Sequence, residues 1–161
     1  MITNNAGSAK PCPCQSGKTY DFCCRIIHLG QQKAELPEEL MRARYSAYVF
    51  GIKDFILSSW AFESRPEHLT LNGKIRWFAL EIVDSEPVSA QSTSAHVSFA
   101  AKYGHDNRLF ILEERATFIK RSNRWFYLGG DSRSYARKLG GKAKCPCGSG
   151  KKFKRCCLQD L

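Results

Sequence analysis

The eight cysteines of the chain fall in two short segments, one near each end, and these segments carry the residues best suited to chemistry. Each segment contains a C-x-C pair, then eight residues, then an adjacent C-C pair. The second segment repeats the first without a gap, so that Cys12 corresponds to Cys145 and Cys24 to Cys157. The two sets are Cys12, Cys14, Cys23 and Cys24, and Cys145, Cys147, Cys156 and Cys157.

This spacing predicts a metal site in each segment. Tetrahedral zinc takes four nitrogen or sulfur ligands, and sulfur lies about 2.3 Å from the ion. Two short-spaced pairs joined by a reversing segment supply such a set, and Gly17 and Gly150 permit the positive backbone dihedrals that turn amides toward sulfur. We therefore expect two bound ions, zinc in kind, although four thiolates also suit iron. Because the thiolates close the coordination shell, we expect structural rather than catalytic sites.

Two alternatives bear on this ligand set. A disulfide between the adjacent Cys23 and Cys24 would close a strained ring, and redox pairs usually read C-x-x-C. His28 lies four residues after Cys24 and could replace it as the fourth ligand, because imidazole nitrogen is a good zinc donor. The second segment has no equivalent histidine, so Cys24 is the preferred ligand.

Composition limits the class of protein. With 161 residues, 43% of them hydrophobic, the chain can bury one ordinary core. No run of 18 or more apolar residues predicts a membrane span, and the polar start of the chain lacks the apolar block of a signal peptide. We therefore expect a cytoplasmic protein, in which the cysteines are metal ligands rather than a disulfide framework.

The C-terminal part of the chain is strongly basic. Nine lysines and arginines and no acidic residue lie between Arg133 and Arg155, in a chain with a formal net charge of +10. Such a segment suits an acidic protein surface or the phosphates of ribosomal or other RNA. The sequence has no feature for reading base edges, so we do not expect sequence-specific DNA recognition. The candidate partner-binding residues are Lys142, Lys144, Lys151, Lys152, Lys154 and Arg155.

The segment between the cysteine motifs predicts helices followed by strands. A helix is expected from Pro37 to a break at Gly51, and a second over residues 53–60. Strands are expected at residues 74–83, 94–103, 109–120 and 125–128, with a hairpin turn at Ser122 and Asn123. This order indicates an α+β fold. We divide the chain into an N-terminal motif with its linker (1–34), a central domain (35–131) and a basic linker with the C-terminal motif (132–161).

A family resemblance rests on particular residues. The stretch Met-Arg-Ala-Arg-Tyr-Ser-Ala-Tyr at residues 41–48 and Arg-Trp-Phe-Tyr at residues 124–127, together with the cysteine segments, resemble the bacterial YchJ family. The terminal segments resemble the SEC-C motif of the C-terminal tail of the secretion ATPase SecA. The resemblance implies a nuclear transport factor 2-like central domain, in which helices and a curved sheet enclose a conical cavity, and acidic or ribosomal partners. Two departures stand out: Gln15 replaces a glycine of the motif, and both copies end in Cys-Cys where the SecA tail has Cys-His.

Two other functions remain open at this point. The central cavity could hold a small-molecule ligand or an enzyme site, although no pair of acid or base groups has a spacing that specifies a mechanism. Closed thiolate sites could also release their metal on oxidation, as in a thiol redox or metal sensor. A non-enzymatic interaction module is the preferred function. The candidate acid and base groups are His96, His105, Glu113, Glu114 and Asp131.

Overall fold

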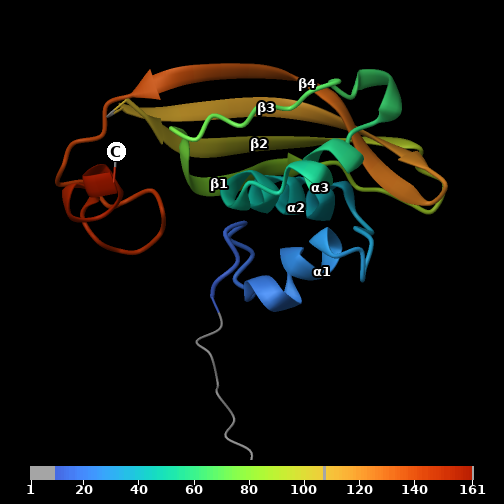
Figure 1. The fold of residues 1–161 in the computed structure, drawn as a ribbon, viewed down its shortest axis with the longest axis horizontal. Coiled ribbons are helices and arrows are strands. Elements are labelled where there is room, and N and C mark those ends of the chain that lie inside the picture. The colour runs from blue at the N-terminus through green and yellow to red at the C-terminus, as the bar shows by residue number, and fades with distance from the viewer. Residues whose placement is uncertain (1–9, 107, 161) are drawn as a thin grey trace, which may run out of the picture.

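Four antiparallel strands form one sheet in the order in which they occur along the chain (Figure 1). They are β1 (Arg76–Ser85), β2 (Ser94–His105), β3 (Arg108–Arg121) and β4 (Arg124–Arg137). This computed structural model describes residues 10–106 and 108–160. The predicted turn at Ser122 and Asn123 is confirmed, since both have positive φ values and Arg121 pairs with Arg124.

The predicted last strand is too short. β4 continues well beyond residue 128 and pairs with β3 as far as Leu109 opposite Arg137, with a bulge beside Thr117 and Phe118. Glycine, aspartate and serine after Leu128 are weak strand formers, but the long edge of β3 supplies backbone hydrogen-bond partners whatever the side chains are. Residues 132–137 therefore belong to the sheet, although the division from sequence placed them in the basic linker.

Helix α2 begins and ends where its local signals indicate, whereas α3 ends two residues before the predicted limit at residue 60. In α2 (Pro37–Phe50), Pro37 occupies the first turn and the Glu39 carboxylate accepts hydrogen bonds from the backbone N–H groups of Glu35 and Leu36. Gly51 ends the helix in the left-handed conformation, with φ of 70°. The shorter α3 (Lys53–Ser58) follows, then a 3₁₀ turn, η2 (Phe62–Ser64). No helix among the described residues is long and apolar enough to cross a membrane.

The two cysteine motifs belong to two hydrophobic clusters of different size. The main cluster packs α2 against the sheet through residues such as Tyr45, Val97 and Phe118, and it includes cysteines of the N-terminal motif. A second, smaller cluster joins the C-terminal motif to Phe78 and Leu109 of the sheet. Figure 1 accordingly shows the N-terminal motif beneath the helices and the C-terminal motif at one end of the sheet. The α+β fold predicted from the sequence is confirmed.

Candidate metal centres

Each motif folds its four cysteines into one cluster of sulfur atoms. In both clusters, the four Sγ atoms all lie within 4.8 Å of one another. The distance is 3.6 Å between Cys14 and Cys23 and 3.6 Å between Cys147 and Cys156. Four sulfurs placed about 2.3 Å from one ion at tetrahedral angles would lie about 3.8 Å apart. All eight cysteines are free thiols, so the donor type and the spacing fit a thiolate-bound metal.

The same backbone hydrogen bonds build both motifs. The N–H of Cys12 donates to the Lys18 carbonyl at 2.9 Å, and the N–H of Cys145 donates to the Lys151 carbonyl at 2.8 Å. In the N-terminal motif, Cys23 follows η1 (Tyr20–Phe22) and Cys24 begins α1 (Cys24–His28). In the C-terminal motif, Cys156 follows η3 (Phe153–Arg155) and Cys157 begins η4 (Cys157–Asp160). The sequence repeat is thus also a structural repeat.

Hydrogen bonds within each cluster separate the pKa values of its thiols. Hydrogen bonds to Cys14 and Cys24 hold the pKa of Cys12 well below its usual range, and the bond to Cys12 raises the pKa of Cys14 to about 11. In the C-terminal cluster, burial opposes ionisation of Cys147, but hydrogen bonds from Ser149 lower its pKa to about 6. Each cluster therefore offers a ready thiolate, and a divalent ion would displace the remaining protons.

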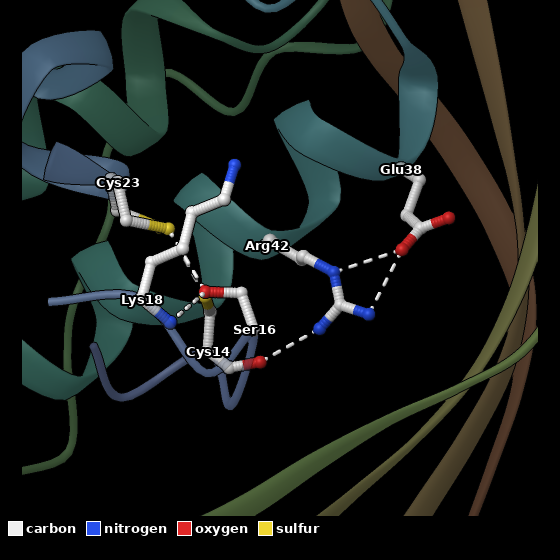
Figure 2. A network of polar contacts seen from close by, with 7 residues as sticks. Cys14, Ser16, Lys18, Cys23, Glu38 and Arg42 are labelled. Atoms are coloured by element: carbon white, nitrogen blue, oxygen red, sulfur yellow. Dashed lines mark hydrogen bonds and ion pairs between the residues drawn. The ribbon is translucent and has the colours of Figure 1, made fainter. Parts of the chain in front are cut away.

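Helix α2 holds the N-terminal motif from behind. The Ser46 hydroxyl donates to Cys24 Sγ at 3.3 Å and lies 3.6 Å from Cys12 Sγ. Figure 2 shows Arg42 donating to the Cys14 carbonyl at 2.8 Å while it pairs with Glu38 at 2.9 Å. Groups that orient metal ligands through hydrogen bonds raise the affinity of a site for its metal. Nothing in the spacing of the sequence pointed to these two side chains, which belong to a helix that begins well after the motif has ended.

His28 lies outside the sulfur cluster, with both ring nitrogens engaged. Its Nε2–H donates to the Ala43 carbonyl at 2.8 Å, so Nδ1 accepts the hydrogen bond from the Tyr20 hydroxyl at 2.9 Å. The ring also packs against Phe55. Burial lowers the pKa of His28, which favours this neutral form. These contacts favour Cys24 over His28 as the fourth ligand and give His28 the role of fastening α1 to α2.

Replacing His28 by alanine tests that assignment. We expect the metal content per chain to stay unchanged, while the free energy of unfolding falls by about 1–3 kcal/mol because a buried hydrogen-bonded ring is lost. Elemental analysis and thermal unfolding of the same preparation measure both. His68→Ala, at a side chain that is 88% exposed, is the control and should alter neither. Loss of one metal ion in the His28 variant would show that the histidine is a ligand after all.

Gln15, the departure from the glycine of the motif, connects the two motifs. Its φ of 59° lies in the left-handed region, as does the 81° of Gly148, its counterpart in the repeat. A non-glycine residue there costs about 1–2 kcal/mol. The Gln15 side chain donates to the Cys147 carbonyl at 3.4 Å. The conformation is thus shared with the glycine, and the added side chain reaches the other motif.

The predicted partner-binding residues form an exposed basic group on the C-terminal motif. All six side chains are exposed, and none of them forms an ion pair with a described residue. Arg133, by contrast, lies in β4 and pairs with Glu113 of the adjacent strand. The six residues that we call the basic patch are Lys142, Lys144, Lys151, Lys152, Lys154 and Arg155.

Only one of the five candidate acid and base groups reaches the central cavity. Glu114 lines it, whereas the neighbouring Glu113 bonds to Arg133 and Tyr135 on β4, as expected for adjacent residues on a strand. His96, near the start of β2, forms a hydrogen bond with Glu86, which follows β1. The remaining two, His105 and Asp131, also lie away from the cavity lining. Outside this cavity, Glu113, Glu114 and Asp131 line one open pocket on the sheet, so the structure brings three of the carboxylates together but neither histidine.

Fold and site together define the chain as a nuclear transport factor 2-like domain that carries cysteine motifs of the SEC-C type. The family model described as "YchJ, middle NTF2-like domain" matches residues 36–130, and the model of the SEC-C motif matches residues 142–159. The chain belongs to the YchJ family. It is 33% identical to a UPF0225 protein of Vibrio vulnificus, over 92% of this chain and 99% of that protein. A UPF0225 protein of Vibrio cholerae is 35% identical, over 91% and 98% respectively.

Two solved structures show the same architecture. The solution structure of a SEC-C motif containing protein from Rhodopseudomonas palustris has a TM-score of 0.67 and 29% identity, covering 74% of this chain and 96% of that one. The crystal structure of a SEC-C motif containing protein from Psychrobacter arcticus has a TM-score of 0.63 and 28% identity, covering 93% and 96%. The expected nuclear transport factor 2-like fold is therefore confirmed.

Proposed function

We propose that the chain is a zinc-binding, non-enzymatic interaction module with a role associated with secretion or translation. The basic patch carries this proposal, because six exposed cations lie on one small motif without ion-pair partners among the described residues. Charges arranged in this way attract an acidic surface and accelerate its association. The partner is an acidic protein surface or the RNA of a ribosome.

The proposed metal is zinc, with one ion in each motif. Four thiolates complete a tetrahedral shell, which leaves no coordination position for water or substrate and gives the ion a structural role. In the C-terminal motif, the ion would hold the loop that displays Lys151 and Lys152 between its two cysteine pairs. Clusters of free thiols persist in reducing compartments, so we also propose a cytoplasmic location.

Charge reversal within the basic patch tests the proposal. In the double variant Lys151→Glu/Lys152→Glu, we expect co-sedimentation with purified bacterial ribosomes to fall about tenfold or more, because each phosphate contact contributes a salt-dependent attraction. Binding of the unaltered chain should weaken steeply as the salt concentration rises. Lys53→Glu/Lys74→Glu makes the same change of net charge at exposed lysines outside the motif and is the matched control.

Each outcome of this experiment has a separate meaning. If both double variants lost the same amount of ribosome binding, the attraction would depend on net charge alone, and the basic patch would not be a binding site. Binding that survives ribonuclease treatment of the ribosomes would identify a protein surface as the partner. Metal content must be the same in all three proteins, so that a lost interaction reflects charge and not a lost zinc ion.

A further inference from the structure

The central domain contains a cavity of about 210 Å³ between α2 and the sheet. Its walls are mainly aromatic and aliphatic, with Tyr45 and Tyr48 from α2, Trp60 from the segment after α3, and Trp77 and Leu112 from the sheet. Drug-sized ligands occupy pockets of about 300–1,000 Å³, so this cavity suits a smaller molecule of one or two rings. The metal centres and the basic patch do not contribute to its lining.

Arg44 places a buried positive charge in this apolar wall. The residue is 3% exposed, and its guanidinium lies 4.6 Å from the centroid of the Trp60 ring and 4.3 Å from that of Tyr127. Its hydrogen bonds to the Ile56 carbonyl and the Ser59 hydroxyl both come from Nη1. Nε and Nη2 of Arg44 form no hydrogen bond with a described residue. They can donate to a molecule in the cavity that Arg44 lines.

Glu114 places a carboxylate in the same cavity. Its Oε1 accepts a hydrogen bond of 2.6 Å from the Tyr127 hydroxyl, which leaves Oε2 available. Burial raises the pKa of Glu114, and the Tyr127 hydrogen bond and the charge of Arg44 act against that rise. Gly130 on β4 makes room for this side chain, since a Cβ there would collide with the Glu114 carboxylate. The Glu114 carboxylate can therefore occupy this position only because residue 130 has no side chain.

The two charged groups share one cavity without meeting each other. No ion pair joins Arg44 and Glu114, although each shifts the pKa of the other through space. Charged groups in an apolar environment are costly unless hydrogen bonds satisfy them. A molecule whose edge presents an acceptor to Arg44 and a donor to Glu114 would satisfy both. An anion would pair with Arg44 but be repelled by Glu114, and a cation would pair with Glu114 but be repelled by Arg44. Neither would therefore satisfy both groups.

We propose that the cavity binds a small, neutral aromatic or heteroaromatic molecule with a hydrogen-bond acceptor and donor on one edge, as in a carboxamide or a lactam. Its ring lies among the aromatic walls, its carbonyl oxygen accepts from Arg44, and its N–H donates to Glu114. The cavity selects by this polar edge, because the walls alone would accept any small ring. The proposal is independent of metal binding and of the basic patch.

Three single-ring probes with different edges test the proposal: benzamide, benzoate and benzylammonium. The readout is the indole N–H signal of each tryptophan in nuclear magnetic resonance spectra, assigned with Trp60→Phe and Trp77→Phe variants. We expect benzamide to shift the Trp60 and Trp77 signals saturably, with an affinity about tenfold higher than either charged probe. Trp125 does not line the cavity, so its signal should stay in place and serves as the internal reference.

Two variants then test the carboxylate. Glu114→Gln removes the charge that repels benzoate, so the preference for benzamide over benzoate should fall about tenfold. Gly130→Ala leaves Glu114 and the aromatic walls in the sequence but displaces the carboxylate, and it should weaken benzamide binding while benzoate gains relative to it. This second variant keeps the test open if the first does not fold. Absence of saturable shifts, or equal affinities for the three probes in the unaltered chain, would overturn the proposal, as would a preference that neither variant changes.

Discussion

Replacing Cys12 and Cys24 by serine is expected to remove one zinc ion and to destabilise the whole domain. Cys14 and Cys24 are 0% and 1% exposed, and with Cys12 they belong to the same cluster as Tyr45 and Phe118. The bound ion would therefore lie against the main core, and structural zinc contributes on the order of 10 kcal/mol in small zinc domains. A loss of about 5 kcal/mol would lower the melting temperature of a chain of this length by about 10–20 °C.

The repeat supplies the matched control, Cys145→Ser/Cys157→Ser. Those positions are the counterparts of Cys12 and Cys24 in the second segment, but they lie in the separate cluster at the end of the sheet. We expect this variant also to lose one zinc ion, while the melting temperature of the domain changes by about 4 °C or less. Elemental analysis and calorimetry measure both quantities. Equal destabilisation in the two variants would refute the conclusion that only the N-terminal motif belongs to the main core. Iron in place of zinc would change the proposed cofactor.

Phe153→Ala is expected to release the C-terminal motif from the sheet without loss of its metal. Phe153 is 3% exposed and packs edge-to-face on Phe78, with a centroid distance of 6.5 Å. It is the largest side chain that the motif contributes to a small cluster, and truncating a buried phenylalanine costs about 3–5 kcal/mol. Amide hydrogen exchange within residues 142–158 should accelerate about 100-fold, while the sheet and the zinc content stay unchanged.

The control for this prediction makes the same substitution on the surface. Phe22 lies in the N-terminal motif and is 78% exposed, so Phe22→Ala removes the same atoms without opening a buried contact. Exchange in both motifs should then match that of the unaltered chain. If Phe153→Ala left the exchange rates unchanged, the motif would be held by other contacts, of which the Gln15 hydrogen bond to Cys147 is the first candidate.

Much of the architecture could be predicted because its signals are local. Pro37 and Gly51 bound the helix α2 through their own backbone preferences, and the turn at Ser122 and Asn123 follows from two residues that tolerate positive φ. The two sets of cysteines could likewise be grouped before any fold was known, because the ligands of each set are so close in sequence that they must meet within a short loop. A repeat of that spacing is a property of the sequence alone.

The tertiary structure decided which distant groups act together. Ser46 and Arg42 of α2 support the N-terminal cysteines, and no periodicity places a helix behind a loop that precedes it in the chain. The meeting of Arg44 and Glu114 in one cavity depends on how α2 packs against the sheet, and the length of β4 depends on the free edge of β3. Ligand spacing and turn chemistry are set by a few bonds along the chain, whereas these contacts arise from packing between segments that the sequence holds far apart.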